Sequence, residues 1–121
     1  MTQHKSQHPT NRGKPTYGFA GLVSFLRTPV CHNLDQLDAD IAVMGAPTDE
    51  GSPFMPGSRF GSRSIREQSL RFGANGYFDH DTDKVFLKYE LDNNRIVDVG
   101  DADVVPADVK GTFENITNLT R

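Results

Sequence analysis

The fold class is decided by the segment Asp40-Ile-Ala-Val-Met-Gly-Ala-Pro-Thr-Asp-Glu-Gly51, which continues as Ser52-Pro-Phe-Met-Pro-Gly-Ser-Arg-Phe-Gly61 and Ser62-Arg-Ser-Ile-Arg66. A short apolar run over residues 41–44 stops at Gly45, and a loop rich in proline and glycine leads into an amphipathic segment that carries arginines. Strand, shaped loop and helix in this order are typical of the opening of an α/β unit. Such folds place ligands at the loops after the carboxyl ends of their strands. The sequence therefore predicts an α/β fold.

The bulk properties restrict the size of the fold and the class of partner. The 121 residues, with a mass of 13.4 kDa, leave room for one small domain. The net charge of -3 gives no general attraction to nucleic acid or to anionic membranes. No apolar run approaches the ~20 residues of a membrane span, and no signal peptide is visible at the N-terminus. With Cys31 as its single cysteine, the chain is predicted to be cytoplasmic, with neither a nucleic-acid nor a membrane partner.

Composition divides the chain into two parts. Residues 1–16 are polar and predict a disordered tail, because they cannot bury enough surface to order themselves. Residues 17–121 form the predicted folded part. Its last segment has an apolar stripe at Val109, Phe113 and Ile116, and no helix stop signal follows before the chain ends. This pattern fits a truncated domain, and it equally fits a domain that ends in a helix.

Local patterns predict the remaining elements. A helix is expected after the loop, capped by Ser58 or Ser62. Its buried stripe is predicted to consist of Ile65, Ser69 and Phe72, with Arg59, Arg63 and Arg66 on a face of their own. The strand over 41–44 has few polar residues and is expected to be covered on both faces. Residues 85–91 and 95–101 are predicted to be two strands, able to pair as a hairpin.

An acidic segment, 79–83, raises the question of a metal site. Asp79, Asp81, Asp83 and Glu90 match positions of a calcium loop, but Lys84 stands where the sharp turn needs glycine, and the flanks do not read as helices. We therefore interpret the segment as a solvated acidic loop, with calcium binding as the minor alternative. The sequence also supplies no convergent histidine and carboxylate ligands for a catalytic metal.

The loop arginines allow two interpretations. Close to a helix start, Arg59, Arg63 and Arg66 could bind an anion or a carboxylate. The more ordinary interpretation, which we favour, is a charged face or an ion-pair network with the many acidic residues of the chain.

One family resemblance rests on the opening segment. The runs Gly45-Ala-Pro-Thr-Asp-Glu-Gly51 and Pro56-Gly-Ser-Arg-Phe-Gly61, followed by Ile65-Arg66, resemble the N-terminal signature of the ureohydrolases, the arginase/agmatinase superfamily. The agmatinase branch is the more similar. Val97-Asp-Val-Gly-Asp101 is similar to the family's next strand, which also ends in Gly-Asp. The resemblance covers roughly residues 17–121.

The resemblance implies the N-terminal part of a three-layer α/β/α fold with a mainly parallel sheet, here incomplete at its C-terminus. It implies a full-length enzyme that hydrolyses a guanidino compound, agmatine foremost, to urea and an amine at a centre of two manganese ions. It further implies a homo-oligomer, a trimer or a hexamer. The family's ligand motifs Gly-Gly-Asp-His, Asp-Ala-His-x-Asp and Ser-x-Asp-x-Asp are missing from this sequence. The chain alone is therefore expected to bind no manganese and to be inactive.

The family motif also suggests which residues matter. Asp49, Gly57, Arg59 and Arg66 match it, and the resemblance implies that they shape the rim of the active site; no catalytic residue and no metal ligand is predicted. Met55 stands where the family usually has arginine, in a loop near the substrate entrance. The alternative function is a small non-catalytic α/β module that binds a ligand or another subunit.

Overall fold

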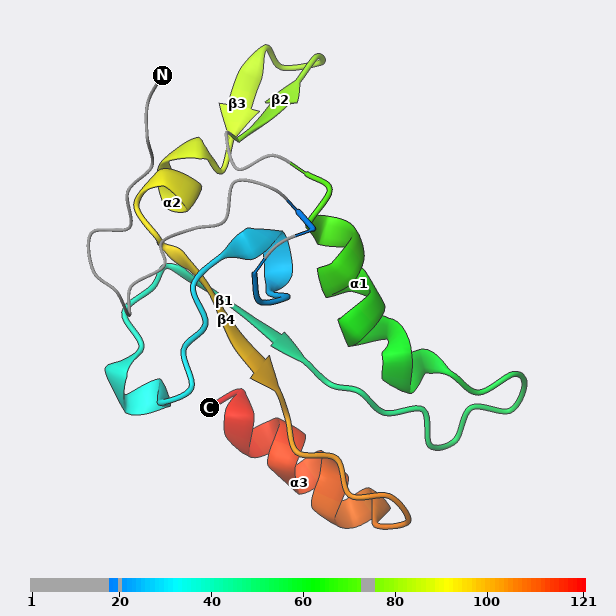
Figure 1. Ribbon diagram of the computed structural model, residues 1–121. Coiled ribbons are helices and arrows are strands. Elements are labelled where there is room, and N and C mark those ends of the chain that lie inside the picture. The colour runs from blue at the N-terminus through cyan, green and yellow to red at the C-terminus, as the bar shows by residue number, and fades with distance from the viewer. Residues whose placement is uncertain (1–17, 20, 73–75) are drawn as a thin grey trace.

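The computed structural model describes residues 18–19, 21–72 and 76–121, so the predicted tail over residues 1–16 lies outside the described residues. The described chain forms short helices and two small sheets (Figure 1). The elements in chain order are β1 (Ile41–Gly45), α1 (Gly61–Ser69), β2 (Tyr77–Asp79), β3 (Lys84–Phe86), α2 (Lys88–Asp92), β4 (Ile96–Asp101) and α3 (Val109–Leu119). Short 3-10 turns occupy Phe25–Arg27, Leu34–Gln36 and Ser58–Phe60.

Strands β1 and β4 run parallel, which confirms the predicted α/β class. Their register places Gly45 opposite Asp101, so both carboxyl ends lie at the same edge of the sheet. On the other side of β4, the N–H of Asp98 donates to the carbonyl of Pro29 and its carbonyl accepts from the N–H of Cys31, each at 2.9 Å. Asp98 therefore lies in a strand that has backbone neighbours on both sides.

Helix α1 begins at Gly61 and ends at Ser69. The Ser69 hydroxyl accepts a hydrogen bond from the Leu26 N–H at 2.8 Å, which ties the end of the helix to the 25–27 turn. The predicted buried stripe is wrong for two of its three members, because Ser69 is buried whereas Ile65 and Phe72 are exposed. The reason is that α1 contacts the rest of the described chain mainly through polar groups, which a search for apolar periodicity overlooks.

The predicted strand over residues 85–91 is correct only for its first two residues, and the strand over 95–101 is confirmed as β4, but the predicted hairpin between them is wrong. Strand β3 ends at Phe86 and pairs antiparallel with β2. Leu87 then adopts a left-handed conformation with φ 60°, which breaks the extended backbone, and α2 follows at once. Leu91, expected on a strand, packs into the core from this helix. Strand β4 pairs with β1 and not with the strand that precedes it in the chain.

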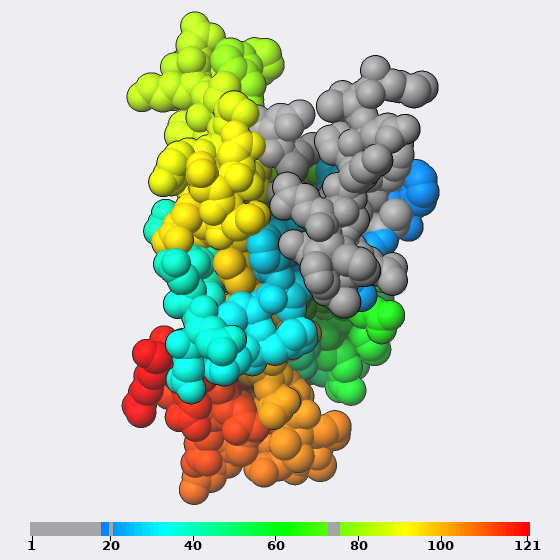
Figure 2. All heavy atoms as spheres, turned by 60° about the vertical axis from the view of Figure 1, so that its left-hand side comes forward, coloured from blue at the N-terminus to red at the C-terminus, as the bar shows by residue number. Residues whose placement is uncertain are grey.

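Helix α3 confirms the helix predicted for the last segment of the chain. The Asp108 side chain accepts a hydrogen bond from the Gly111 N–H at 2.9 Å and so caps the helix. The residue that α3 buries is Thr112, whose hydroxyl accepts from the N–H of Val105 at 3.1 Å. Val109 and Phe113, from the predicted stripe, are exposed. Figure 2 shows α3 at one end of the molecule and the β2–β3 hairpin at the other.

The hydrophobic core of the described chain is small. Its buried members are Leu26, Leu91 and Ile96, and partly buried apolar side chains pack against them from Phe25, Val43, Tyr77 and Leu87. Ile41 is exposed, so the prediction that the first strand is covered on both faces is wrong for this chain. No helix in the described part of the chain is long and apolar enough to cross a membrane.

Candidate functional site

An arginine on α1 is paired with an aspartate inside β4. Arg66 donates from Nε to Asp98 Oδ2 at 2.8 Å and from Nη2 to Asp98 Oδ1 at 3.1 Å. The Asp98 side chain is buried, with an exposed fraction of 3%, and that of Arg66 is mostly covered, with an exposed fraction of 12%. The planar guanidinium thus meets the carboxylate with two nitrogens, a geometry that a lysine could not reproduce. The pair attaches α1 to the central strand.

Backbone groups complete the environment of Asp98. The Phe25 N–H donates to its Oδ2 at 2.8 Å, and the Gly100 N–H donates to its Oδ1 at 2.9 Å. Burial by itself would raise the pKa of Asp98, but the hydrogen bonds from Arg66 and from these two N–H groups outweigh it and lower the pKa. Asp98 is therefore a fixed anion at neutral pH, and its hydrogen-bonding capacity is in use.

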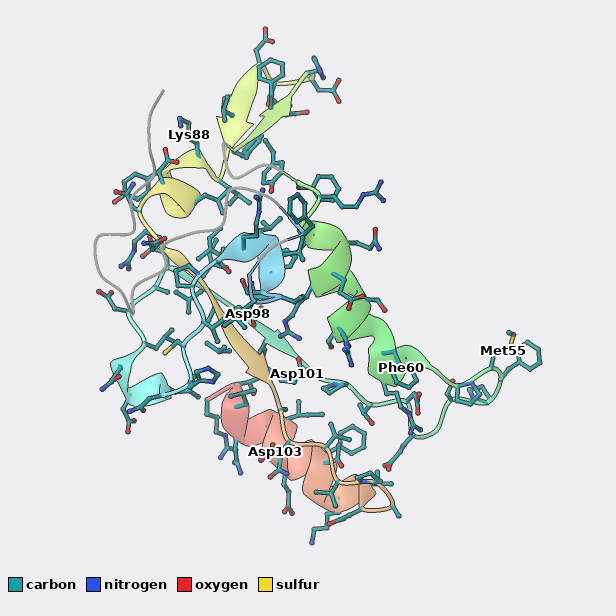
Figure 3. The ribbon with its side chains drawn as sticks, viewed as in Figure 1. Met55, Phe60, Lys88, Asp98, Asp101 and Asp103 are labelled. Carbon is teal, nitrogen blue, oxygen red and sulfur yellow. The ribbon has the colours of Figure 1, made fainter. Side chains whose placement is uncertain are left out.

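The same arginine reaches the carboxyl edge of the sheet. Arg66 Nη1 donates to Asp101 Oδ1 at 2.6 Å, and Nη2 donates to the Gly100 carbonyl at 2.9 Å. Figure 3 shows Asp98 and Asp101 in sequence along β4 toward its carboxyl end. A side chain at Gly45 would collide with the Asp101 carboxylate and lie 2.7 Å from the Ser62 hydroxyl, so the end of β1 must be glycine to leave room for this contact.

A second ion pair closes the loop between β1 and α1. Arg59 donates from Nη2 to Asp49 Oδ1 at 2.7 Å and from Nε to Asp49 Oδ2 at 3.0 Å. The Asp49 side chain is only 2% exposed, whereas Arg59 is 54% exposed. Hydrogen bonds from Arg59 lower the pKa of Asp49, and the same contact raises the pKa of Arg59. Ser58 adds a hydroxyl hydrogen bond to the Thr48 carbonyl at 3.0 Å.

The Asp49–Arg59 pair lies at the base of the loop, and the tip of the loop is apolar and extends away from the sheet. Phe54 is 81% exposed and Met55 is 78% exposed, and Figure 3 shows Met55 at the end of the loop. Met55 has φ 53° and Gly57 has φ 155°, backbone conformations that L side chains rarely adopt. A side chain at Gly57 would meet no neighbouring atom within 4 Å, so the backbone conformation, and not crowding, calls for glycine there.

The structure places the predicted site residues in two separate ion-pair networks. Asp49 and Arg59 form one, next to Gly57, and Arg66 belongs to the other. The prediction that Arg59, Arg63 and Arg66 share one face of the helix is wrong. Arg59 precedes α1, and the exposed Arg63 has its Nε 3.8 Å from Glu67 Oε1. The favoured interpretation of the arginines as an ion-pair network is confirmed.

Sequence reasoning missed Asp98 and Asp101 as members of the site. A signal was present, because Asp98 interrupts an apolar strand, where an unpaired charge would be costly. The calcium interpretation is wrong, since a calcium loop follows a helix, whereas Asp79 ends strand β2 and the 79–83 segment is the turn of the β2–β3 hairpin. The Asp79 carboxylate instead accepts from the Thr82 hydroxyl at 2.5 Å. In the described part of the chain, no cluster of three or more His, Cys, Asp or Glu is arranged to hold a metal ion.

Comparison with known proteins identifies the family. A model of the arginase family matches residues 39–121. The chain is 36% identical over 104 residues to putative agmatinase 1 of Schizosaccharomyces pombe, an alignment that covers 83% of this chain and 25% of that protein. It is 33% identical over 91 residues to proclavaminate amidinohydrolase of Streptomyces clavuligerus, covering 75% of this chain and 26% of that protein. It is 45% identical over 54 residues to the mitochondrial guanidino acid hydrolase of Homo sapiens, covering 45% of this chain and 15% of that protein.

The chain belongs to the arginase family, the ureohydrolases, and corresponds to the N-terminal portion of an agmatinase-like member. It spans about a quarter of the length of the relatives with the longest alignments.

Proposed function

We propose that the full-length form of this protein hydrolyses a guanidino compound to urea and an amine, with agmatine as the first candidate substrate. The observation that carries this proposal is the family match over residues 39–121. Relatives named agmatinase, guanidino acid hydrolase and amidinohydrolase support the reaction class. The proposal includes a homo-oligomer, a trimer or a hexamer, in the cytoplasm.

Within this proposal, the described residues shape the rim of the active site. The Asp49–Arg59 pair closes the base of the loop after β1, and Gly57 provides the backbone turn. Arg66 fixes the carboxyl end of β4 through Asp98 and Asp101. Loops at this edge are where α/β enzymes bind their ligands. All four predicted residues thus act by positioning the backbone.

The metal of the proposed enzyme is a pair of manganese ions. The described residues do not fit such a site: they contain no cluster of three or more suitable ligands, and the carboxylates of Asp98 and Asp49 are already bound to arginines. We therefore assign the metal no ligand in this part of the chain. The 121-residue chain alone is proposed to be inactive.

Two experiments test the proposal. The coding DNA is read beyond the codon for Arg121, where an open frame that encodes Gly-Gly-Asp-His and Asp-Ala-His-x-Asp motifs is expected. The full-length protein is then purified with manganese, and urea release is measured from agmatine and from guanidino acids, beside the 121-residue chain under the same conditions. Urea release by the long form only is expected; no release by the long form from any guanidino compound would disprove the function.

A non-catalytic module for binding a ligand or a subunit is the alternative function. It is favoured by the number of large apolar side chains that are exposed, among them Phe54, Ile65 and Phe113. This alternative predicts that the 121-residue chain unfolds cooperatively on its own. The enzyme-fragment hypothesis predicts broad, poorly cooperative unfolding and aggregation through unpaired strand edges. A urea titration followed by circular dichroism and by intrinsic tyrosine fluorescence distinguishes the two, because only a cooperative unit gives coincident curves.

A further inference from the structure

One acid in the loop region is in no ion pair with any of the residues that the structure describes. Residues 46–66 contain the ionisable side chains Asp49, Glu50, Arg59, Arg63 and Arg66. All except Glu50 are in ion pairs, either with each other or with Glu67, Asp98 and Asp101. In the described chain, no cationic side chain lies within ion-pair distance of Glu50. The charge of Glu50 acts on Arg59 and helps to raise the pKa of that side chain, but Arg59 forms its ion pair with Asp49 instead.

Glu50 also has a buried oxygen without a hydrogen-bond partner. Its Oε2 is shielded from solvent and has no partner in the described chain, and the same holds for the Thr48 hydroxyl two residues earlier. Buried carboxylate and hydroxyl oxygens nearly always have partners, because leaving them unpaired is costly. Asp49, between these two residues, is fully engaged with Arg59. The two unpaired acceptors thus belong to a loop whose backbone is fixed.

The neighbouring groups decide what kind of partner these acceptors fit. A carboxylate ligand would need a free cation, but Arg59 and Arg66 are both committed to aspartates, and the exposed Arg63 lies 3.8 Å from Glu67 on α1. The loop tip over residues 52–58 carries no charge and exposes Phe54 and Met55. The region therefore offers negative charge and apolar surface. This combination matches a cationic group at the end of an aliphatic chain.

We propose that Glu50 binds the ammonium group at the far end of a guanidino-amine substrate, with the Thr48 hydroxyl as a second acceptor. The proposal rests on the function proposed above and adds the residue that selects for the amine. An ammonium group has three N–H donors and no acceptor, which is the chemistry that oxygens without a donor call for. Discrimination by charge follows, since a carboxylate at the same place would be repelled by Glu50.

The test compares three substrates of the full-length manganese-loaded protein that differ only at the far end: agmatine with an ammonium, 4-guanidinobutanoate with a carboxylate, and butylguanidine with a methyl group. The wild type is expected to show its lowest KM for agmatine. In Glu50→Gln, the KM for agmatine rises about tenfold or more, the range for a lost hydrogen bond to a charged group. Its kcat for agmatine and both constants for butylguanidine stay within about twofold of the wild type, because these do not depend on the ammonium contact.

Matched variants separate recognition from folding. Glu67→Gln removes one acidic charge from the exposed face of α1 and is expected to leave all three KM values unchanged. Glu50→Asp keeps the charge and is expected to retain part of the preference for agmatine. If Glu50→Gln does not fold, inhibition of the wild type supplies the test: 1,4-diaminobutane must inhibit butylguanidine hydrolysis more strongly than butylamine does.

Three results would overturn the inference. These are a lower wild-type KM for 4-guanidinobutanoate than for agmatine, an equal effect of Glu50→Gln on agmatine and butylguanidine, and equal inhibition by the diamine and the monoamine. All three presuppose measurable hydrolysis. A wild type that releases urea from none of the compounds refutes the proposed function itself, and the two failures are thereby distinguishable.

Discussion

Arg66 of α1 and Asp98 of β4 are joined through two nitrogen–oxygen contacts of 2.8 and 3.1 Å, although 32 residues separate them in the chain. The same guanidinium also binds Asp101, so one side chain connects the helix to both the middle and the end of the strand. A buried carboxylate is stable only while its partners remain. The attachment of α1 to the sheet therefore depends on Arg66.

Removing the positive charge at this position is expected to destabilise the chain strongly. Arg66→Met leaves Asp98 buried without a counter-ion and should lower the free energy of unfolding by about 3 kcal/mol. Arg66→Lys keeps the charge but loses the two-nitrogen geometry, so an intermediate loss is expected. Urea denaturation of the full-length protein, followed by circular dichroism, measures both, because the 121-residue chain alone is not expected to unfold cooperatively. Arg63→Met, at an exposed position of the same helix, serves as control and should stay within about 0.5 kcal/mol. Equal effects at positions 63 and 66 would contradict the structure.

Stability should fall in acid because of Asp98. Its pKa in the folded chain lies below the ordinary value of 3.8, so the stabilisation it provides is fully present above that value. Stabilisation is lost progressively as the pH falls through the folded pKa, where the carboxylate is protonated and releases Arg66. Urea midpoints measured between neutral and strongly acidic pH report this loss. In Arg66→Met the main favourable contact is gone while burial still raises the pKa, so the acid-dependent loss should shrink. An unchanged acid dependence in that variant would show that other carboxylates are responsible.

Gly45→Ala should be harmful although alanine is small. The added methyl group would collide with the Asp101 carboxylate and with the Ser62 side chain, forcing β4 and α1 apart. Overpacking of this kind costs about 1–3 kcal/mol. Gly61→Ala is the matched control, because Gly61 is already helical, with φ -61°, and a methyl group there meets no atom within 4 Å. That variant is expected to be neutral or slightly stabilising. The unfolding temperature should therefore fall in Gly45→Ala and stay unchanged or rise slightly in Gly61→Ala. An unchanged unfolding temperature in Gly45→Ala would argue against the close approach of Asp101 and Ser62 to Gly45.

Breaking the Asp49–Arg59 pair should loosen the loop after β1. Chymotrypsin cleaves after exposed aromatic residues, and Phe54 is available at the loop tip. Cleavage needs a segment that can adapt to the protease, so Asp49→Asn is expected to be cut several times faster than the wild type at equal protease concentration. Ser58→Ala removes only one hydroxyl hydrogen bond to Thr48 and should have a smaller effect. Fragment masses identify the cleaved bond. Equal cleavage rates in all three proteins would show that the ion pair does not restrain the loop.

Some features could be predicted because they depend on near neighbours in the chain. The apolar run before Gly45 predicts β1, and the apolar stripe that begins at Val109 predicts α3. The family resemblance draws attention to Asp49, Gly57 and Arg59 in one loop, and in the structure Asp49 and Arg59 form an ion pair there. The family, too, could be identified from the residues of that loop.

Other features were predicted wrongly because the same short pattern of apolar and polar residues is compatible with more than one structure. Residues 85–91 alternate like a strand, but a left-handed residue at position 87 divides them into β3 and α2. The apolar stripe of α1 matched helical spacing, yet the helix is attached through Arg66 and Ser69, whose polar contacts no periodicity reveals. The contact between α1 and β4 is thus made by the charged Arg66, whereas the sequence predicted an apolar contact.

By itself, the sequence determined the α/β class, the shaped loop after β1, the final helix and the membership of the ureohydrolase family, since each follows from residues that are adjacent or one turn apart. Only the tertiary structure decided that β4 pairs with β1, that Arg66 holds Asp98 and Asp101, and that Glu50 forms no ion pair with the described residues. The physical reason is that charge pairing across long stretches of chain depends on which groups meet in space. Nothing in the order of the residues specifies which acid reaches which arginine until the strands and the helix have packed.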